Sequence, residues 1–274
     1  MTVPGIKLND GNTIPQLGFG VWQVGNDEAA AVVGKALDVG YRHIDTAAIY
    51  GNEEGVGKAL KTSGVARGDI FLTTKLWNAD QGYDSAFRAF DASLKRLGTD
   101  YVDLYLIHWP VPAQDRFLDT WRALIKLRED GLVKSIGVSN FRIADLERII
   151  SETDVAPVLN QIELHPQFQQ NELRVFHEKK GIATEAWSPL GQGRILEHPT
   201  LRQIAEKHGK TVAQIILRWH LDIGNIVIPK SVTPARIEEN FDVFGFKLTS
   251  GDHDAISALN NGQNGRIGPH PDSV

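Results

Sequence analysis

Cysteine is absent from this sequence of 274 residues, and methionine occurs once. Without thiols the chain can form neither disulfide bonds nor thiolate metal sites, which fits a reducing compartment. No apolar run is long enough to span a membrane, and the first residues lack the basic and apolar segments of a secretory signal. We therefore expect a cytoplasmic protein that has no membrane partner.

Clustered positive charge is also missing. The 29 Lys and Arg residues are scattered among 34 Asp and Glu residues, and the formal net charge is -5. Nucleic-acid-binding proteins gather basic side chains on one face, so we do not expect nucleic acid as a partner. The chain is 42% hydrophobic and shows no linker or low-complexity segment. We expect one domain over residues 1–274, acting as a monomer.

Short runs rich in β-branched and aromatic residues alternate with segments of helical spacing. Most runs are too apolar for a sheet with one exposed face, which favours parallel strands covered on both sides. The predicted strands are residues 17–20, 41–45, 70–76, 101–109, 133–140, 158–164, 182–188 and 225–231. The predicted helices are residues 27–39, 52–62, 84–97, 115–129, 142–151, 170–180, 198–208, 211–222 and 234–242.

Eight strand–helix units in a chain of this length predict an α/β fold, a (β/α)8 TIM barrel with extra helices near the C-terminus. Residues 6–14 alternate around an Asp10-Gly11 turn, which predicts a β-hairpin. We expect this N-terminal hairpin to plug the bottom of the barrel.

Barrel enzymes carry their chemistry at the carboxyl ends of the strands. Asp45, Lys75 and His108 end three consecutive predicted strands, and Tyr50 follows the first of them. A phenol has a pKa of about 10 and is a poor proton donor at neutral pH unless a nearby cation lowers that value. Lys75 can be the cation, kept charged by Asp45, while His108 polarises a carbonyl oxygen. The set predicts that Tyr50 is a general acid for an oxygen that gains negative charge.

The glycine fingerprint of dinucleotide-binding folds is missing. "GQGRIL" and "GVGKAL" have Leu196 and Leu60 where the third glycine of G-x-G-x-x-G belongs. "GVGKA" is not a P-loop either, because Asn52 and Ala59 replace the first glycine and the Ser/Thr. A Rossmann site is therefore disfavoured.

The chain resembles the aldo-keto reductase family essentially from end to end. "GYRHIDTAAIYGNEEGVGKAL" is similar to the family signature around the catalytic Asp and Tyr, "TTKLW" carries its Lys, and "DLYLIHWP" carries its His. "KSIGVSNF", "NQIELHP" and "IPKSVTPARIEEN" resemble further family blocks, and "SPLGQG" is similar to the small bacterial reductases typified by 2,5-diketo-D-gluconate reductase. The resemblance implies a TIM barrel that reduces aldehydes and ketones with NADPH, by hydride transfer to the carbonyl carbon and protonation of its oxygen by the tyrosine.

The resemblance also implies that NADPH lies extended across the barrel mouth. Ser139, Asn140 and Gln161 offer donors and acceptors to the nicotinamide carboxamide, and Trp187 offers a stacking face where many relatives have tyrosine. The resemblance also implies a loop that binds the pyrophosphate, formed by Ser188, Leu190, Gly191 and Gln192, although on its own this loop reads as an ordinary turn. It further implies a block that binds the 2′-phosphate and adenine, formed by Lys230, Ser231, Val232, Arg236, Glu239 and Asn240.

Thr233 stands where some close relatives carry arginine. We therefore expect a weaker preference for NADPH than in those relatives, with NADH as the poorer cofactor. The histidines outside the mouth lack metal-ligand spacing, and no metal site is expected.

Three tryptophans, Trp22, Trp77 and Trp109, follow predicted strands at positions where the family places aromatic residues around its substrate. Together with His108 they predict an apolar cup for a small carbonyl compound. A keto-sugar acid such as 2,5-diketo-D-gluconate follows from the resemblance alone, and methylglyoxal or another small dicarbonyl is the alternative.

The segment after Asn260 is rich in glycine and proline. It is either a mobile end or a flap in which Ile267 and His270 close over the site.

Two other functions compete with reduction. Barrel glycosidases use two carboxylates, and Glu163 and Glu185 lie near the ends of neighbouring strands, but a hydrolase leaves Tyr50 and Lys75 unexplained. A regulatory subunit that binds NADPH with little turnover is the second alternative, against which the complete set of catalytic residues argues.

Overall fold

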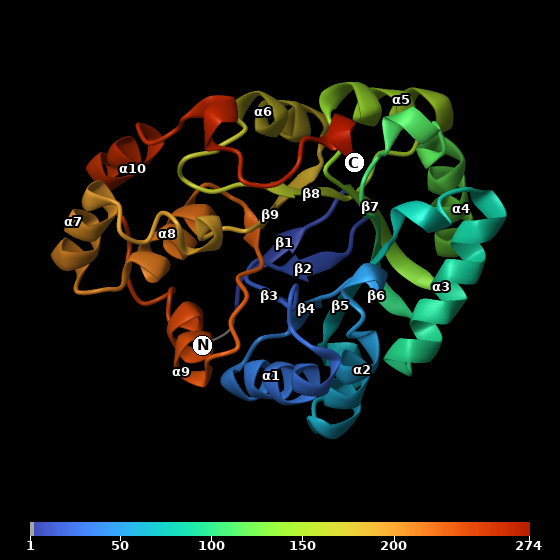
Figure 1. The fold of residues 1–274 in the computed structure, drawn as a ribbon, viewed down its shortest axis with the longest axis horizontal. Helices are drawn as coiled ribbons and strands as arrows, with labels where there is room; N and C mark the ends of the chain where they lie inside the picture. The colour runs from blue at the N-terminus through green and yellow to red at the C-terminus, as the bar shows by residue number, and fades with distance from the viewer. Residues whose placement is uncertain (1–2) are drawn as a thin grey trace.

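The computed structural model describes residues 3–274, and a parallel eight-stranded sheet lies at its centre (Figure 1). The strands run in the order β10-β9-β8-β7-β6-β5-β4-β3, and a parallel bridge between Leu17 and Val227 joins the two edges. Gly18 donates to the Val227 carbonyl at 2.9 Å and Gly20 to the Pro229 carbonyl at 3.1 Å, so the sheet closes. The predicted (β/α)8 barrel is confirmed.

The strands of the barrel are short and buried. They are β3 (Phe19–Gly20), β4 (His43–Asp45), β5 (Phe71–Leu76), β6 (Val102–Ile107), β7 (Val133–Ser139), β8 (Leu159–Glu163), β9 (Ala183–Trp187) and β10 (Ile226–Val227). The last strand is shorter than the predicted strand at residues 225–231. Ile228 still donates to the Ala186 carbonyl at 3.4 Å, but Pro229 has no N–H with which to continue the pairing.

The helices surround the barrel, as Figure 1 shows. They are α1 (Asn26–Val39), α2 (Glu53–Thr62), α3 (Tyr83–Leu97), α4 (Phe117–Glu129), α5 (Ile143–Thr153), α6 (Asn171–Lys180), α7 (Pro199–His208), α8 (Val212–Asp222), α9 (Pro234–Phe241) and α10 (Ser250–Ser257). The extra helices near the C-terminus are present. Helix α4 begins at Phe117 and not at residue 115, because Asp115 has a left-handed backbone with φ 52° that cannot belong to an α-helix.

The N-terminal hairpin closes one end of the barrel as predicted. Its strands, β1 (Gly5–Lys7) and β2 (Thr13–Pro15), pair antiparallel around the turn that contains Asp10 and Gly11. Leu8 and Ile14 pack in one apolar cluster with the barrel residues Leu104, Leu106, Leu159 and Ile226. This cluster fills the interior at the amino ends of the strands, so the opposite end is the one available for chemistry.

Helix α10 begins with a capping box in which Thr249 and Asp252 bond each other's backbone N–H groups. The Asp252 carboxylate also accepts from Lys207 and His208, each at 2.8 Å. "DHD" at residues 252–254 thus belongs to the acidic first part of a helix. Within residues 3–274 no helix has both the length and the apolar character needed to cross a bilayer.

Candidate active site

Strand alternation and register bring polar side chains into the barrel interior. His43 and Asp45 are two residues apart on β4 and share one face, as do Thr73 and Lys75 on β5. The parallel ladder places Asp45 beside Thr73. On the far side, Gln161 of β8 is the register partner of both Ser139 on β7 and Glu185 on β9. The sequence pattern therefore produces a layer of polar groups inside the carboxyl end of the barrel.

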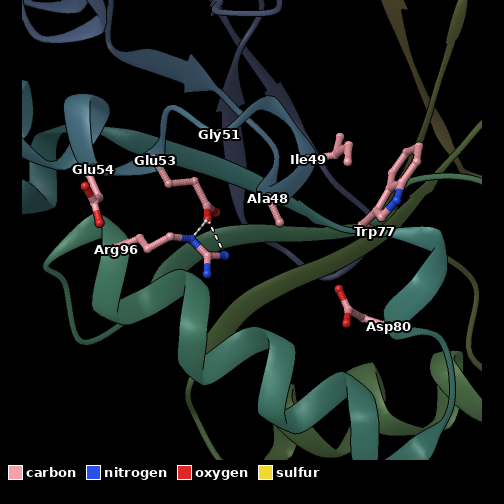
Figure 2. Close-up of a pocket in the computed structure, with 8 residues that line it drawn as sticks. All are labelled: Ala48, Ile49, Gly51, Glu53, Glu54, Trp77, Asp80 and Arg96. Atoms are coloured by element: carbon pink, nitrogen blue, oxygen red, sulfur yellow. Dashed lines mark hydrogen bonds and ion pairs between the residues drawn. The ribbon is translucent and has the colours of Figure 1, made fainter. Parts of the chain in front are cut away.

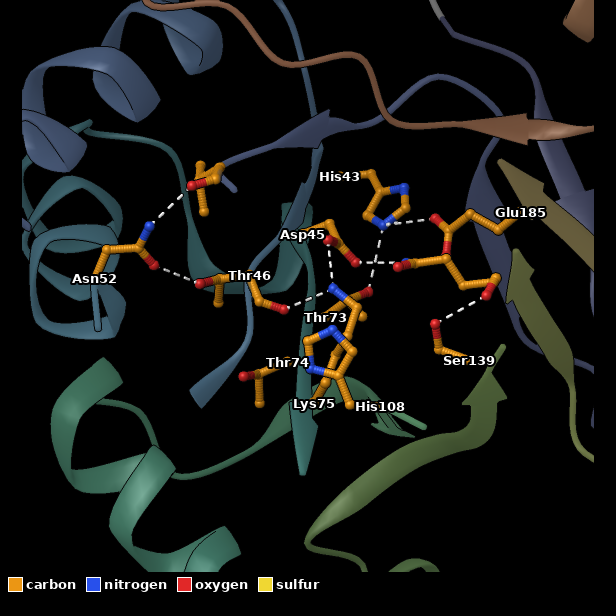
Figure 3. Close-up of polar contacts among 12 residues, drawn as sticks. His43, Asp45, Thr46, Asn52, Thr73, Thr74, Lys75, His108, Ser139 and Glu185 are labelled. Atoms are coloured by element: carbon orange, nitrogen blue, oxygen red, sulfur yellow. Dashed lines mark hydrogen bonds and ion pairs between the residues drawn. The ribbon is translucent and has the colours of Figure 1, made fainter. Parts of the chain in front are cut away.

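Lys75 lies at the centre of this layer, with none of its surface exposed (Figure 3). Its ammonium donates to Asp45 Oδ1 at 2.6 Å and to the Thr46 carbonyl at 2.9 Å. The same Nζ lies 5.1 Å from the centre of the Tyr50 ring. Burial alone would lower the pKa of Lys75, but the Asp45 carboxylate and the Tyr50 phenol raise it above its ordinary value. The cation is therefore retained beside the phenol.

The phenol itself differs from the expectation. Burial raises the pKa of Tyr50 above its ordinary value, and Lys75 lowers it only in part. The expected lowering by Lys75 is present, but the net pKa of Tyr50 does not fall, because loss of hydration outweighs the attraction of the cation. The phenol is consequently protonated at neutral pH, which a proton donor requires.

His108 completes the group. Its ring packs edge-on against Tyr50 at 5.7 Å and against Trp77 at 5.3 Å between ring centres. Burial and the Lys75 charge hold the pKa of His108 well below its usual range, so the imidazole is neutral. A neutral imidazole can donate one N–H to a carbonyl oxygen without a competing ammonium charge of its own. The four predicted residues are therefore brought together.

Sequence reasoning missed Asn52, which holds the loop that carries Tyr50. Its amide donates to the carbonyls of Val21 and Val24 at 2.9 and 3.0 Å, and its oxygen accepts from the Thr46 hydroxyl at 2.8 Å (Figure 3). The side chain is fully buried. An asparagine directly after the Tyr50-Gly51 pair was the available signal, but we considered it only as a mismatch to a P-loop.

The side chains predicted to meet a nicotinamide lie side by side and bond one another. Ser139 Oγ donates to the Gln161 carbonyl at 2.8 Å. Asn140 Nδ2 donates to the His108 carbonyl and to Ser139 Oγ, both at 3.0 Å. Trp187 Nε1 donates to Asn140 Oδ1 at 2.8 Å, which fixes the plane of the indole. The protein thus uses most of the predicted donors itself.

The loop at residues 188–193 uses part of its backbone in its own turns. Gly191 N–H donates to the Ser188 carbonyl at 2.9 Å, and Gly193 N–H donates to the Leu190 carbonyl at 3.0 Å. Gln192 is exposed and has a left-handed backbone with φ 53°. These bonds reduce the number of amides that this loop can offer to a pyrophosphate.

Two exposed cations flank the start of α9. Lys230 and Arg236 make no ion pair within residues 3–274. The amides at the start of α9 contribute little, because Pro234 has no N–H and the Arg236 N–H donates to the Thr233 carbonyl at 3.0 Å. Asn240 Oδ1 is buried without a hydrogen-bond partner in that range. Glu239, predicted to contact adenine, instead accepts from the Thr211 hydroxyl at 2.8 Å. Ser231 Oγ accepts from the Thr233 N–H at 3.1 Å, and Val232 is exposed.

The three predicted tryptophans differ in exposure. Trp22 is 43% exposed, whereas Trp109 is buried at 8% and Trp77 is intermediate. Trp77 also borders a groove of about 460 Å³ on the outer side of the Tyr50 loop (Figure 2). Figure 2 shows Arg96 paired with Glu53 at the other end of this groove, at 2.7 Å. The pair neutralises the cation, and the groove includes none of the four central residues.

The C-terminal segment lies over the ends of β8 and β9. Glu163 accepts from the backbone N–H groups of Ile267 at 2.6 Å and Gly268 at 2.8 Å. A Cβ on Gly268 would meet the Trp187 ring at 2.5 Å, so the segment touches that indole. These contacts favour the flap over a free end, but the predicted His270 is exposed. Figure 1 shows the segment in red crossing toward α5.

The glycosidase alternative fails on the same contacts. Glu163 is covered by the tail that it binds, with 1% exposure, and Glu185 has none. Two carboxylates must flank a sugar bond from opposite sides in an open site. Neither side chain can reach one.

Comparison with known proteins agrees with this geometry. The Aldo/keto reductase family model matches residues 16–261. A solved aldo/keto reductase from Brucella melitensis is 72% identical with a TM-score of 0.92, over 94% of this chain and 100% of that chain. A solved mutant of Gox0644 in complex with NADPH is 53% identical with a TM-score of 0.96, over 100% of this chain and 99% of that chain.

One similar protein is named for its activity. The methylglyoxal reductase DkgA of Salmonella typhimurium (strain LT2) is 55% identical over 269 residues, which are 97% of this chain and 96% of that protein. Sequence, barrel and the cluster of Asp45, Tyr50, Lys75 and His108 lead to one conclusion: the chain belongs to the aldo/keto reductase family.

Proposed function

We propose that this protein reduces a small aldehyde, ketone or keto-sugar acid to the alcohol with NADPH, and that Tyr50 donates the proton. The observation that carries the proposal is the buried Lys75 ammonium, held by Asp45 at 2.6 Å and lying 5.1 Å from the Tyr50 ring. A cation in that position stabilises the phenolate that forms when the proton leaves. The Gox0644 complex supports NADPH as the cofactor.

NADPH, held by the residues named below, would supply the hydride for the new C–H bond at the carbonyl carbon. Tyr50 transfers its O–H proton to the carbonyl oxygen, so that the products are the alcohol and NADP⁺. His108, neutral because burial and Lys75 lower its pKa, donates an N–H to the same oxygen and orients it. Lys75 remains protonated throughout, since Asp45 raises its pKa. The tyrosine regains a proton from solvent before the next turnover.

The residues present fit a nicotinamide dinucleotide. Trp187 has its plane fixed by Asn140, and within residues 3–274 Gln161 Oε1 accepts no hydrogen bond and remains available to a carboxamide. Lys230 and Arg236, without ion pairs in that range, suit a 2′-phosphate beside the α9 N-terminus. Ser139, Asn140, Ser188, Leu190, Gly191, Gln192, Ser231, Val232, Glu239 and Asn240 would line the remainder. NADH, which lacks that phosphate, would bind more weakly.

The substrate we favour testing first is methylglyoxal, because the Salmonella relative carries that name. Trp22, Trp77 and Trp109 would form the apolar wall of the substrate pocket. This wall offers no positive charge that could bind a substrate carboxylate. A keto-sugar acid such as 2,5-diketo-D-gluconate is the second candidate. We further propose that residues 1–274 act as one domain and as a monomer, which light scattering of the purified protein would test.

The test is NADPH oxidation with methylglyoxal, 2,5-diketo-D-gluconate and a simple aromatic aldehyde. Tyr50→Phe should bind NADPH as wild type does but lose about 10²- to 10⁴-fold in kcat, the usual contribution of a general acid. NADPH binding with no turnover of any carbonyl would favour the regulatory-subunit alternative. Full activity of Tyr50→Phe would refute the role of the phenol.

A further inference from the structure

Glu185 is a carboxylic acid inside the barrel that the mechanism above does not use. It precedes Trp187 by two residues on β9, and its side chain has no exposed surface. Figure 3 shows it facing His43 and Asp45 across the polar layer. Gln161 Nε2 donates to Glu185 Oε2 and to Asp45 Oδ2, each at 2.8 Å. One amide therefore bridges two carboxyl groups.

Within the described residues 3–274, no charged cation pairs with Glu185. The Lys75 ammonium is bonded to Asp45 and to the Thr46 carbonyl. His43 Nε2 lies 3.6 Å from Glu185 Oε1, beyond hydrogen-bond distance, and burial lowers the pKa of His43 to about 3, so this ring is neutral. Glu185 Oε1 has no hydrogen-bond partner within residues 3–274. A buried carboxylate in this position would lack a compensating charge, whereas a protonated carboxyl group would not need one.

The bridge also decides how the Gln161 amide is turned. An amide has two N–H donors and one oxygen, and both donors are taken by acidic oxygens. Reversing the amide would place its oxygen against the Asp45 carboxylate, which has no proton to donate. The oxygen Oε1 of Gln161 is consequently free to accept a hydrogen bond. We propose that it accepts one from the nicotinamide carboxamide.

We infer that Glu185 is a positioning residue of the reductase site. Its carboxyl group retains a proton at neutral pH and, together with Asp45, fixes the orientation of the Gln161 amide toward the cofactor. This inference rests on the proposed function for its kinetic consequences only. It predicts two separable effects, one of charge and one of orientation.

The charge effect has a definite sign. Burial raises the pKa of Glu185 to about 8, and the neighbouring Asp45 adds to the increase, while the Gln161 bond and Lys75 oppose it. The titratable groups around it are Asp45 and His43 on β4, Lys75 on β5 and Tyr50; β3 and β10 contribute none. Ionised Glu185 raises the pKa of Tyr50 and weakens it as an acid. Reduction should therefore slow as the pH rises through about 8.

The kinetic experiment compares wild type with Glu185→Gln and Glu185→Met. Glu185→Gln keeps an acceptor for Gln161 but cannot ionise, so kcat should lose its decline near pH 8 while NADPH affinity stays within about 2-fold. Glu185→Met removes the acceptor as well, and NADPH affinity should fall by about 5-fold, the value of one neutral hydrogen bond. An unchanged decline in both variants would overturn the inference.

A second measurement needs no reductase activity, and its main observation is made on the wild-type protein. The infrared spectrum of the wild-type protein should contain a protonated carboxyl C=O band at neutral pH that disappears as the pH rises through about 8. Glu163→Gln is the matched control and should retain the band, because hydrogen bonds lower the pKa of Glu163. Absence of the band from wild type, or its persistence in Glu185→Gln, would contradict the inference even in a protein with no reductase activity.

Discussion

The Lys75 ammonium and the Asp45 carboxylate form an ion pair of 2.6 Å in a part of the barrel where neither side chain is more than 2% exposed. Such a pair adds little stability, because the loss of hydration offsets the attraction. Its position, with Lys75 Nζ 5.1 Å from the centre of the Tyr50 ring, suits the proton-donor role that we propose for that tyrosine. Stability and activity should therefore respond differently when it is removed.

Asp45→Asn should destabilise the protein by about 3 to 5 kcal/mol, because it leaves a buried ammonium without its counter-charge. The double variant Asp45→Asn, Lys75→Met should regain part of that loss, since no charge remains to be compensated. Urea unfolding measures both effects. In both variants kcat should stay well below the wild-type value. A double variant with wild-type turnover would show that the Lys75 cation is not needed.

Arg236→Ala should weaken NADPH binding by about 1.5 to 3 kcal/mol, the scale of a charge-assisted hydrogen bond, and leave NADH binding nearly unchanged. The reason is that only NADPH carries the phosphate that this exposed side chain could reach. Fluorescence titration with each cofactor measures the difference. Arg122→Ala, on the exposed face of α4, is the control and should alter neither affinity. Equal losses for both cofactors would remove Arg236 from the site.

Asn52→Ala should loosen the loop that carries Tyr50. It removes one of the two donors to the Val21 carbonyl and, within residues 3–274, leaves the Val24 carbonyl and the Thr46 hydroxyl without a partner, at about 1 to 3 kcal/mol for each unsatisfied buried group. We expect lower kcat together with faster hydrogen exchange in residues 46–52. Thr62→Ala, an exposed residue on α2, is the control for stability. Unchanged kcat would mean that Tyr50 is positioned without Asn52.

Glu163→Gln should release the C-terminal flap, because an amide oxygen accepts the Ile267 and Gly268 N–H groups more weakly than a carboxylate does. Hydrogen exchange of residues 262–274 measures the release. Burial alone would raise the pKa of Glu163, but the hydrogen bonds from His165, Gly268 and Ile267 lower it.

The pH dependence of the flap follows from that lowered pKa. A lowered pKa means that the carboxylate stabilises the folded state above the ordinary carboxyl range and that this stabilisation is lost as the pH falls through the lowered value. Wild-type exchange in the flap should therefore increase on acidification, and Glu163→Gln should show no such increase. Parallel pH curves for the two proteins would exclude Glu163 as the anchor.

The sequence by itself determined the local elements and their order. Apolar runs of strand length, helical spacing between them and the Asp10-Gly11 turn are local signals, and the barrel, the hairpin and the helices formed where these signals lie. The strand-end rule also selected Asp45, Lys75 and His108 correctly as neighbours, because parallel strands bring their carboxyl ends to one face. Helix and strand ends were less predictable, since single residues such as Asp115 and Pro229 decide them.

Only the tertiary structure decided what each polar side chain faces. Glu163 and Glu185 are both glutamates near strand ends. Glu163 binds backbone N–H groups of the tail, whereas Glu185 has no charged cation beside it among the residues that the structure describes. Their pKa values shift in opposite directions as a result. The net pKa of Tyr50 likewise depends on how much water burial removes. These quantities arise from groups far apart in the chain, which no local pattern can encode.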